Sequence, residues 1–161
     1  MLHLIPAPLH RIGYRAAHRL RLLWWRVRRP RVRGCRILAF DHAGGVLLVR
    51  HSYGSGRWML PGGGLGRNED AVAGARRELA EEVGCRLDEA RLVTLLEEPL
   101  SGATNHVHLV TGRTADAATG DRREVIAAQF FAPGAWPADM AVSHQAGLDA
   151  WVTAAATALR A

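Results

Sequence analysis

Residues Gly63–Cys85 read GGLGRNEDAVAGARRELAEEVGC, a stretch that predicts a helix over 69–83 with Glu78, Glu81 and Glu82 on one turn. At roughly 100° of rotation per residue, the three carboxylates fall within about a 100° arc and repel one another. A hard divalent cation offsets such repulsion, because Mg²⁺ accepts oxygen ligands from a few carboxylates and leaves positions open for water and phosphates. The turn therefore predicts a metal site, with Mg²⁺ as the expected ion and Mn²⁺ as the alternative.

The spacing of the residues in this stretch is a second, more specific signal. In chain order it is Gly63, five residues, Glu69, seven residues, Arg77-Glu78-Leu79, one residue, Glu81-Glu82, one residue, Gly84 and Cys85. This arrangement resembles the Nudix box, and every fixed position of that pattern is filled. The resemblance implies an α/β fold, an α/β/α sandwich around a mixed sheet, and hydrolysis of a diphosphate linked to another group.

The same resemblance implies roles for individual residues. Those implied as metal ligands are Glu78, Glu81, Glu82 and the carbonyl of Gly62. Glu78 and Glu82 remain alternatives for the general base, and Arg77 is expected to orient a glutamate through a charge-assisted hydrogen bond. Glu69 is expected to contact these residues without binding the metal itself. Phosphoryl transfer suits such a site, because it requires positioning and charge neutralisation more than covalent chemistry.

Members of this family often take one further metal-binding carboxylate from a distant segment. Glu97, Glu98 and Glu124 are the candidates, and Glu124 is favoured because it directly precedes a predicted strand. An ordinary surface role for these acids stays open.

The segment before Trp58 carries side chains that could contact a phosphate or a base. We expect Arg50, Tyr53 and Arg57 to bind substrate, with His51 as a further candidate. A solvated loop is the alternative interpretation.

Alternating apolar segments predict the remaining elements. Strands are expected over 36–40, 46–50, 58–60, 91–96, 106–110 and 125–131, and a closing helix over 144–159. A chain of 161 residues with 48% apolar residues is long enough for one domain with a sizeable core. Two cysteines give no disulfide framework, and neither a signal peptide nor a spanning segment is indicated, so a cytoplasmic location is expected.

Positive charge is concentrated at the N-terminus. Residues 1–40 contain ten arginines and no acid, whereas residues 41–161 contain eleven arginines and fifteen acids. Apolar residues at three- and four-residue steps predict an amphipathic helix over Leu9–Val27, ended by Pro30. We therefore divide the chain into a basic arm, 1–33, and a hydrolase domain, 34–161.

The apolar stripe of this arm needs a partner. Docking on its own domain or in a homodimer is favoured, peripheral contact with an anionic membrane is the second alternative, and nucleic acid is unlikely to be the partner.

Two functions remain in competition at this level. The favoured one is a Mg²⁺-dependent hydrolase of a small-molecule substrate in which a nucleoside diphosphate is linked to another moiety, as in an NDP-sugar, ADP-ribose or a nucleotide. The alternative is a non-catalytic module that senses a nucleotide or binds nucleic acid or membrane. The intact set Arg77, Glu78, Glu81 and Glu82 favours the enzyme, because a binding module has little reason to keep a repulsive cluster.

Overall fold

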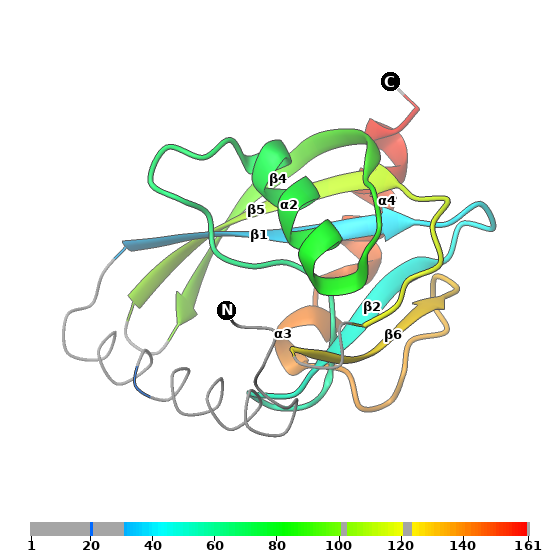
Figure 1. Cartoon of the computed structure of the whole chain (residues 1–161), viewed down its shortest axis with the longest axis horizontal. Coiled ribbons are helices and arrows are strands. Elements are labelled where there is room, and N and C mark those ends of the chain that lie inside the picture. Colours follow the sequence, from blue (N-terminus) through cyan, green and yellow to red (C-terminus); the bar gives the residue numbers. More distant parts are fainter. Residues whose placement is uncertain (1–19, 21–30, 101–102, 121–123, 161) are drawn as a thin grey trace, which may run out of the picture.

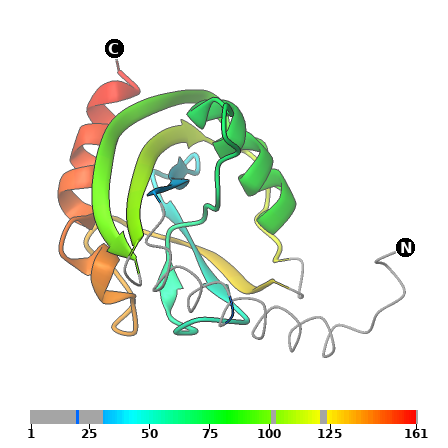
Figure 2. The same ribbon diagram turned by 90° about the vertical axis from the view of Figure 1, so that its left-hand side faces the viewer.

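The computed structural model describes residues 20, 31–100, 103–120 and 124–160. Within the described residues the elements are, in order, β1 Arg31–Phe40, β2 Val46–His51, β3 Trp58–Met59, α2 Ala71–Val83, β4 Asp88–Leu100, β5 Ala103–Arg113, β6 Val125–Phe131, α3 Val142–Gln145 and α4 Leu148–Ala158. Helices α2 and α4 lie on opposite sides of an arched sheet (Figures 1 and 2). The predicted mixed sheet with helices is confirmed.

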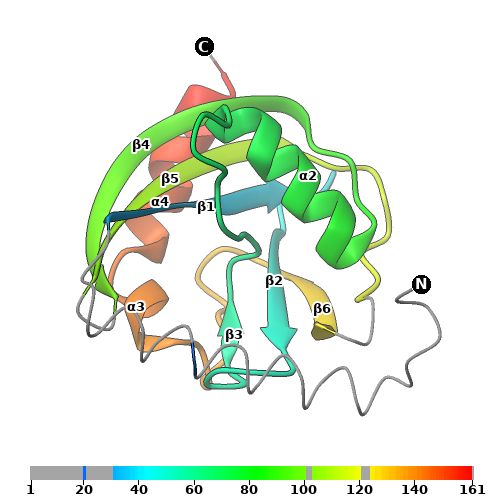
Figure 3. The same cartoon turned by 60° about the vertical axis from the view of Figure 1, so that its left-hand side comes forward.

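The sheet is mixed because of one parallel pairing. Its strand order is β3-β2-β1-β5-β4, and β6 pairs with β2. Strand β1 runs parallel to β5 over its whole length, whereas the other pairs are antiparallel. Strands β1 and β2 pair only at Phe40↔Val46, and β2 then continues between β3 and β6 (Figure 3). The C-terminal end of β2, at His51, therefore lies away from β1 and contacts the C-terminal turn of α2.

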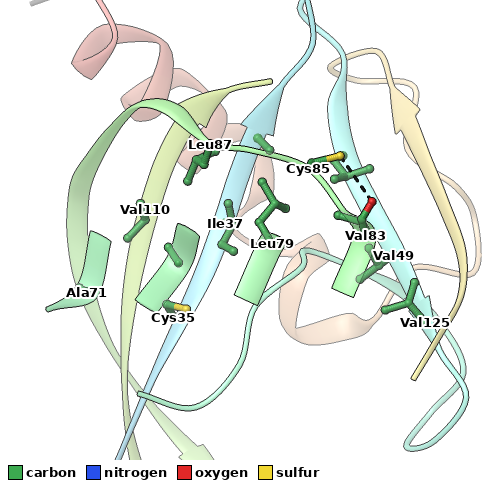
Figure 4. Packing of buried hydrophobic residues seen from close by; sticks show 13 residues of the cluster. Cys35, Ile37, Val49, Ala71, Leu79, Val83, Cys85, Leu87, Val110 and Val125 are labelled. Atoms are coloured by element: carbon green, nitrogen blue, oxygen red, sulfur yellow. Dashed lines mark hydrogen bonds between the residues drawn. The ribbon is translucent and has the colours of Figure 1, made fainter. Parts of the chain in front are cut away.

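Alternation along β1 and β2 divides the core into two clusters. Odd-numbered residues such as Ile37 and Val49 pack with Leu79 and Val83 of α2 (Figure 4). Even-numbered residues of the same strands pack against α4, in a cluster containing Leu38, Phe40, Val46, Leu48, Leu148 and Val152. Because successive side chains of a strand point to opposite faces, one run of apolar residues supports both helices.

Helix α2 has well-defined ends. The side chain of Asp70 accepts hydrogen bonds from the backbone N–H groups of Val72 and Ala73, which caps the N-terminus. Gly84 ends the helix with φ of 70°, a left-handed conformation that suits glycine. The helix begins at Ala71, two residues later than predicted, because Asp70 forms the cap.

The predicted closing helix over 144–159 is wrong in one respect: the segment forms two helices, α3 and α4. Ala146 and Gly147 separate them. A Cβ atom on Gly147 would lie 2.7 Å from the ring of Trp151, so a larger residue at this junction would require the ring to shift. The break turns α3 away from α4 and places His144 against the Trp151 ring.

Apart from Leu20, the predicted arm helix, Leu9–Val27, lies outside the described residues. Its proposed contacts with a second subunit, a membrane or nucleic acid therefore stay predictions, as does the division at residue 33. Strand β1 already begins at Arg31, inside the range assigned to the arm. Among the described helices, none has the length and apolar character needed to cross a membrane.

Candidate functional site

The glycine-rich segment before the box lies directly alongside β1. The backbone N–H groups of Cys35 and Ile37 donate to the carbonyls of Gly63 and Pro61, both at 2.9 Å. Gly62 has φ of 145°, and a Cβ atom there would lie 2.2 Å from the carbonyl oxygen of Cys35. Only glycine permits this approach, which brings the segment between β1 and the acidic end of α2.

Gly63 provides the space for the first carboxylate. A Cβ atom on Gly63 would lie 2.5 Å from the carboxyl group of Glu78, so this carboxylate packs against bare backbone. Burial raises the pKa of Glu78, while its hydrogen bond with Arg77 acts in the opposite direction. Glu78 is thus held close to the glycine turn and partly shielded from water.

Arg77 links the loop and the helix. Its Nε and Nη2 donate to the two carboxylate oxygens of Glu69 at 2.8 and 3.0 Å, and its Nη1 donates to Glu78 at 2.7 Å. Nη2 also donates to the carbonyl of Gly64 at 3.2 Å. The hydrogen bond with Arg77, followed by one from the Gly66 N–H, lowers the pKa of Glu69 to about 2. A fixed guanidinium therefore orients Glu78.

Glu82 is the most enclosed carboxylate of the box. Its side chain is 5% exposed, and burial raises its pKa, with hydrogen bonds from His51 and the Gly62 N–H opposing that change. His51 Nε2 lies 2.9 Å from Glu82 Oε1, and the Gly62 N–H donates to Oε2 at 3.2 Å. Glu82 therefore faces both the end of β2 and the glycine turn.

Glu81 occupies a different environment. Its side chain is 61% exposed and lies 3.3 Å from Arg77 Nη1. The structure therefore places Glu78 and Glu82 at the glycine turn and leaves Glu81 at the solvent edge of the same helical turn.

The distant carboxylate Glu124 lies close to Glu82. Tyr53 donates its phenolic hydroxyl to Glu124 Oε1 at 2.6 Å, and the Ser52 N–H donates to the Glu124 carbonyl at 2.8 Å. Ligand atoms of His51, Glu82 and Glu124 all lie within 4.8 Å of one another. The favoured distant acid and Tyr53 are thus both brought to the box.

The other two acids considered for this role are engaged elsewhere. Glu98 forms a bidentate ion pair with Arg36, at 2.5 and 2.6 Å. Glu97 lies 3.3 Å from His106.

The structure does not bring Arg50 and Arg57 into this group. Arg50 donates to Asp139 at 2.5 Å, and its guanidinium lies 4.9 Å from the centre of the Trp58 ring, on the strand face opposite to His51. Arg57 is exposed in the loop after β2. Substrate contact through either arginine stays a prediction.

His51 is the residue whose role sequence reasoning missed. It entered only as a candidate contact for a phosphate or a base, whereas the structure pairs it with Glu82. The signal was available in strand alternation: Leu47 and Val49 face α2, so His51, two residues further on, faces α2 as well.

The geometry and the sequence agree on one family. The sequence matches the NUDIX domain family over residues 28–152, well over half of its length. The chain belongs to the Nudix family. This match confirms the prediction of a Nudix enzyme, a pyrophosphohydrolase.

Solved structures with the same fold are distant in sequence. A MutT Nudix hydrolase from Burkholderia pseudomallei is 20% identical, with a TM-score of 0.63 over 81% of this chain and 96% of that one. A MutT protein from Methanosarcina mazei Go1 is 18% identical, with a TM-score of 0.58 over 78% and 93%. A UDP-X diphosphatase is 17% identical, with a TM-score of 0.60 over 80% of this chain but 63% of that one. At these identities the similarity establishes the fold.

Proposed function

We propose that this Nudix chain is a divalent-metal-dependent hydrolase that cleaves the diphosphate linkage of a nucleoside diphosphate joined to another moiety. The observation that carries the proposal is the convergence of three carboxylates: Glu78 and Glu82 of α2 lie at the glycine turn, and Glu124, from a distant segment, lies beside Glu82. Burial raises the pKa of both box glutamates. The fold therefore keeps carboxyl groups where their charge is costly, as expected if a cation completes the site.

The donors present fit a divalent cation. We assign Glu78, Glu82, Glu124 and the Gly62 carbonyl as residues that would hold Mg²⁺ or Mn²⁺, with Glu81 reaching the site from its exposed edge. When bound, the cation neutralises phosphate charge and lowers the pKa of water in the site. No nucleophilic side chain is required.

The chain's own residues supply positioning and proton transfer. Arg77 holds the Glu78 carboxyl in a fixed orientation through one hydrogen bond, while its contacts with Glu69 and Gly64 fix the guanidinium itself. Glu78 or Glu82 takes the proton from the attacking water; both have raised pKa values, and a base gains strength as its pKa rises.

A substrate panel tests this proposal directly. Nucleoside triphosphates, NDP-sugars, ADP-ribose and dinucleoside polyphosphates are incubated with protein and Mg²⁺ or Mn²⁺, and products are separated by chromatography. We include UDP-linked compounds because one structural neighbour is described as a UDP-X diphosphatase. We expect metal-dependent cleavage of at least one diphosphate, abolished by EDTA and strongly reduced in Glu78→Gln and Glu82→Gln.

The competing binding module makes a different prediction for the same panel. It would bind one of these nucleotides in calorimetry without cleaving it in any metal. That result would contradict the hydrolase proposal.

A further inference from the structure

The imidazole of His51 lies inside the carboxylate cluster and not at its edge. The side chain is 6% exposed, and its Nε2 lies 2.9 Å from Glu82 Oε1. The ring of Tyr53 packs against the imidazole, with 5.1 Å between the ring centroids. The phenolic hydroxyl of Tyr53 donates to Glu124, which links His51 to the second glutamate. A basic nitrogen therefore lies within 4.8 Å of carboxylate oxygens from helix α2 and from the segment just before β6.

The spacing of these atoms suits direct coordination. Two ligands at right angles on one ion, each with a bond of about 2.1 Å, lie about 3.0 Å apart, and opposite ligands lie about 4.2 Å apart. The Nε2–Oε1 distance is 2.9 Å, and all three ligand atoms fall within 4.8 Å. Shifts of a few tenths of an ångström would bring His51, Glu82 and Glu124 onto a common ion.

We propose that His51 is a nitrogen ligand of the catalytic cation, so that the site prefers Mn²⁺ to Mg²⁺. This inference rests on the proposed function, because it uses Glu82 and Glu124 of the same site. Imidazole nitrogen binds first-row transition ions well, whereas Mg²⁺ prefers oxygen ligands and retains its waters. A site made only of carboxylates and carbonyls would discriminate less strongly between the two ions.

A positioning role for His51 is the outcome that the test must separate from ligation. A histidine that only orients Glu82 also supports metal affinity, typically about 10–100-fold. Loss of affinity alone therefore does not distinguish the two roles. The identity of the coordinating atom does.

The experiment loads the full-length protein with Mn²⁺ in the absence of substrate and records pulsed EPR. We expect a ¹⁴N coupling typical of a directly bound imidazole in the wild type, replaced by a ¹⁵N coupling when the protein is grown with ¹⁵N-histidine. The labelled wild type needs no mutation, so misfolding cannot confuse this result. His51→Gln, whose amide can still donate a hydrogen bond to Glu82, should lose the coupling.

Affinity measurements supply a second readout. We expect His51→Gln to weaken Mn²⁺ binding by about tenfold or more and Mg²⁺ binding by less than about threefold, since only the transition ion gains from nitrogen. His106→Gln is the matched control: His106 is 3.3 Å from Glu97, outside the cluster. This variant should keep both the coupling and the affinities.

The results that overturn the proposal are specific. Wild-type Mn²⁺ protein without a histidine nitrogen coupling, or a coupling that survives in His51→Gln, excludes His51 as the ligand. Hydrolysis of the substrate panel is measured in parallel. Cleavage without the coupling refutes this inference alone, whereas the coupling without cleavage of any substrate refutes the proposed function alone.

Discussion

Helices α2 and α4 cover opposite faces of one sheet, yet they differ sharply in charge. Helix α2, AVAGARRELAEEV, has five charged residues among 13, whereas α4, LDAWVTAAATA, has only Asp149 among 11. Both bury an apolar face against β1 and β2. Packing therefore explains the apolar stripe of each helix but not the acidic face of α2, which we attribute to function.

The α2 and α4 sides also differ in how they surround a buried ionisable side chain, Glu82 on one side and His144 on the other. Glu82, on the α2 side, is 5% exposed and has two hydrogen-bond partners, His51 Nε2 and the Gly62 N–H. His144, on the α4 side, is 4% exposed, and its Nε2 has no partner among the described residues. Burial opposes charge in both, raising the pKa of Glu82 and lowering that of His144 to about 3. Of these two groups, only Glu82 has, among the described residues, a hydrogen-bond partner at each polar side-chain atom, and these partners can stabilise its charged form.

Removing charge from the two helices should give the largest difference. Glu82→Gln keeps the shape of the side chain but removes its charge, so we expect kcat to fall by about 100-fold or more. Asp149→Asn makes the matched change on α4 and should leave kcat within about twofold. Steady-state rates on the substrate found by the panel measure both. Equal rates in the two variants would show that the α2 face is an ordinary charged surface.

Two adjacent arginines of α2 sharpen the comparison within one helix. Arg77 joins Glu69 to Glu78, whereas Arg76 donates to the Leu87 carbonyl and contacts none of the site glutamates among the described residues. Lysine cannot reproduce the two-pronged contact with Glu69, so Arg77→Lys should lower kcat about tenfold. Arg76→Lys should change kcat by less than about twofold, and a similar loss in both would indicate a general stability effect.

The parts of the fold and of the site that the sequence predicted are those that depend on residues close together in the chain. The box predicted α2 and its acidic turn, because these depend on residues close together in sequence. It also placed Glu82 near the Gly62 turn, which the structure joins at 3.2 Å. The contacts between Glu69 and Arg77, eight residues apart, follow the same local logic.

The features that sequence reasoning missed depend on tertiary packing. His51 is 31 residues from Glu82, and its position follows from the divergence of β2 from β1 after one pairing. The contacts of Arg50 with Asp139 and Trp58 likewise join segments far apart in sequence, and its predicted substrate contact stays a prediction. The break at Gly147, where the Trp151 ring packs close to the backbone, is not evident from the local helix pattern.

The α4 side gives a stability prediction without an activity change. His144 stays neutral in the fold, whereas the unfolded chain protonates near the ordinary value of 6.5. Stability should therefore fall as pH drops from about 6.5 toward 3, because the unfolded state binds a proton that the fold excludes. His144→Leu removes this effect and the unpartnered nitrogen, so we expect about 1 kcal/mol more stability at pH 7 and a flatter acid limb.

Thermal melts from pH 4 to pH 8 measure that change, with kcat as the control. Activity should be unchanged, since His144 lies on the opposite side of the sheet. An acid limb as steep in His144→Leu as in the wild type would show that another group causes the loss of stability.

The smallest expected effect returns to the α2 side, in metal-free protein. The raised pKa of Glu82 means that the folded carboxyl holds its proton more tightly than the unfolded one. Its favourable contribution is present below the ordinary value of 4.5 and is lost as pH rises through the raised pKa. With EDTA at pH 8, Glu82→Gln should therefore melt roughly 2 °C above the wild type, an advantage that shrinks toward pH 4.

Adding Mn²⁺ should reverse the order, because only the wild type gains binding free energy from the cation. A Glu82→Gln protein that melts below the wild type in EDTA at every pH would mean that His51 and Gly62 stabilise the charged carboxylate fully, so that the fold bears no cost for keeping this group.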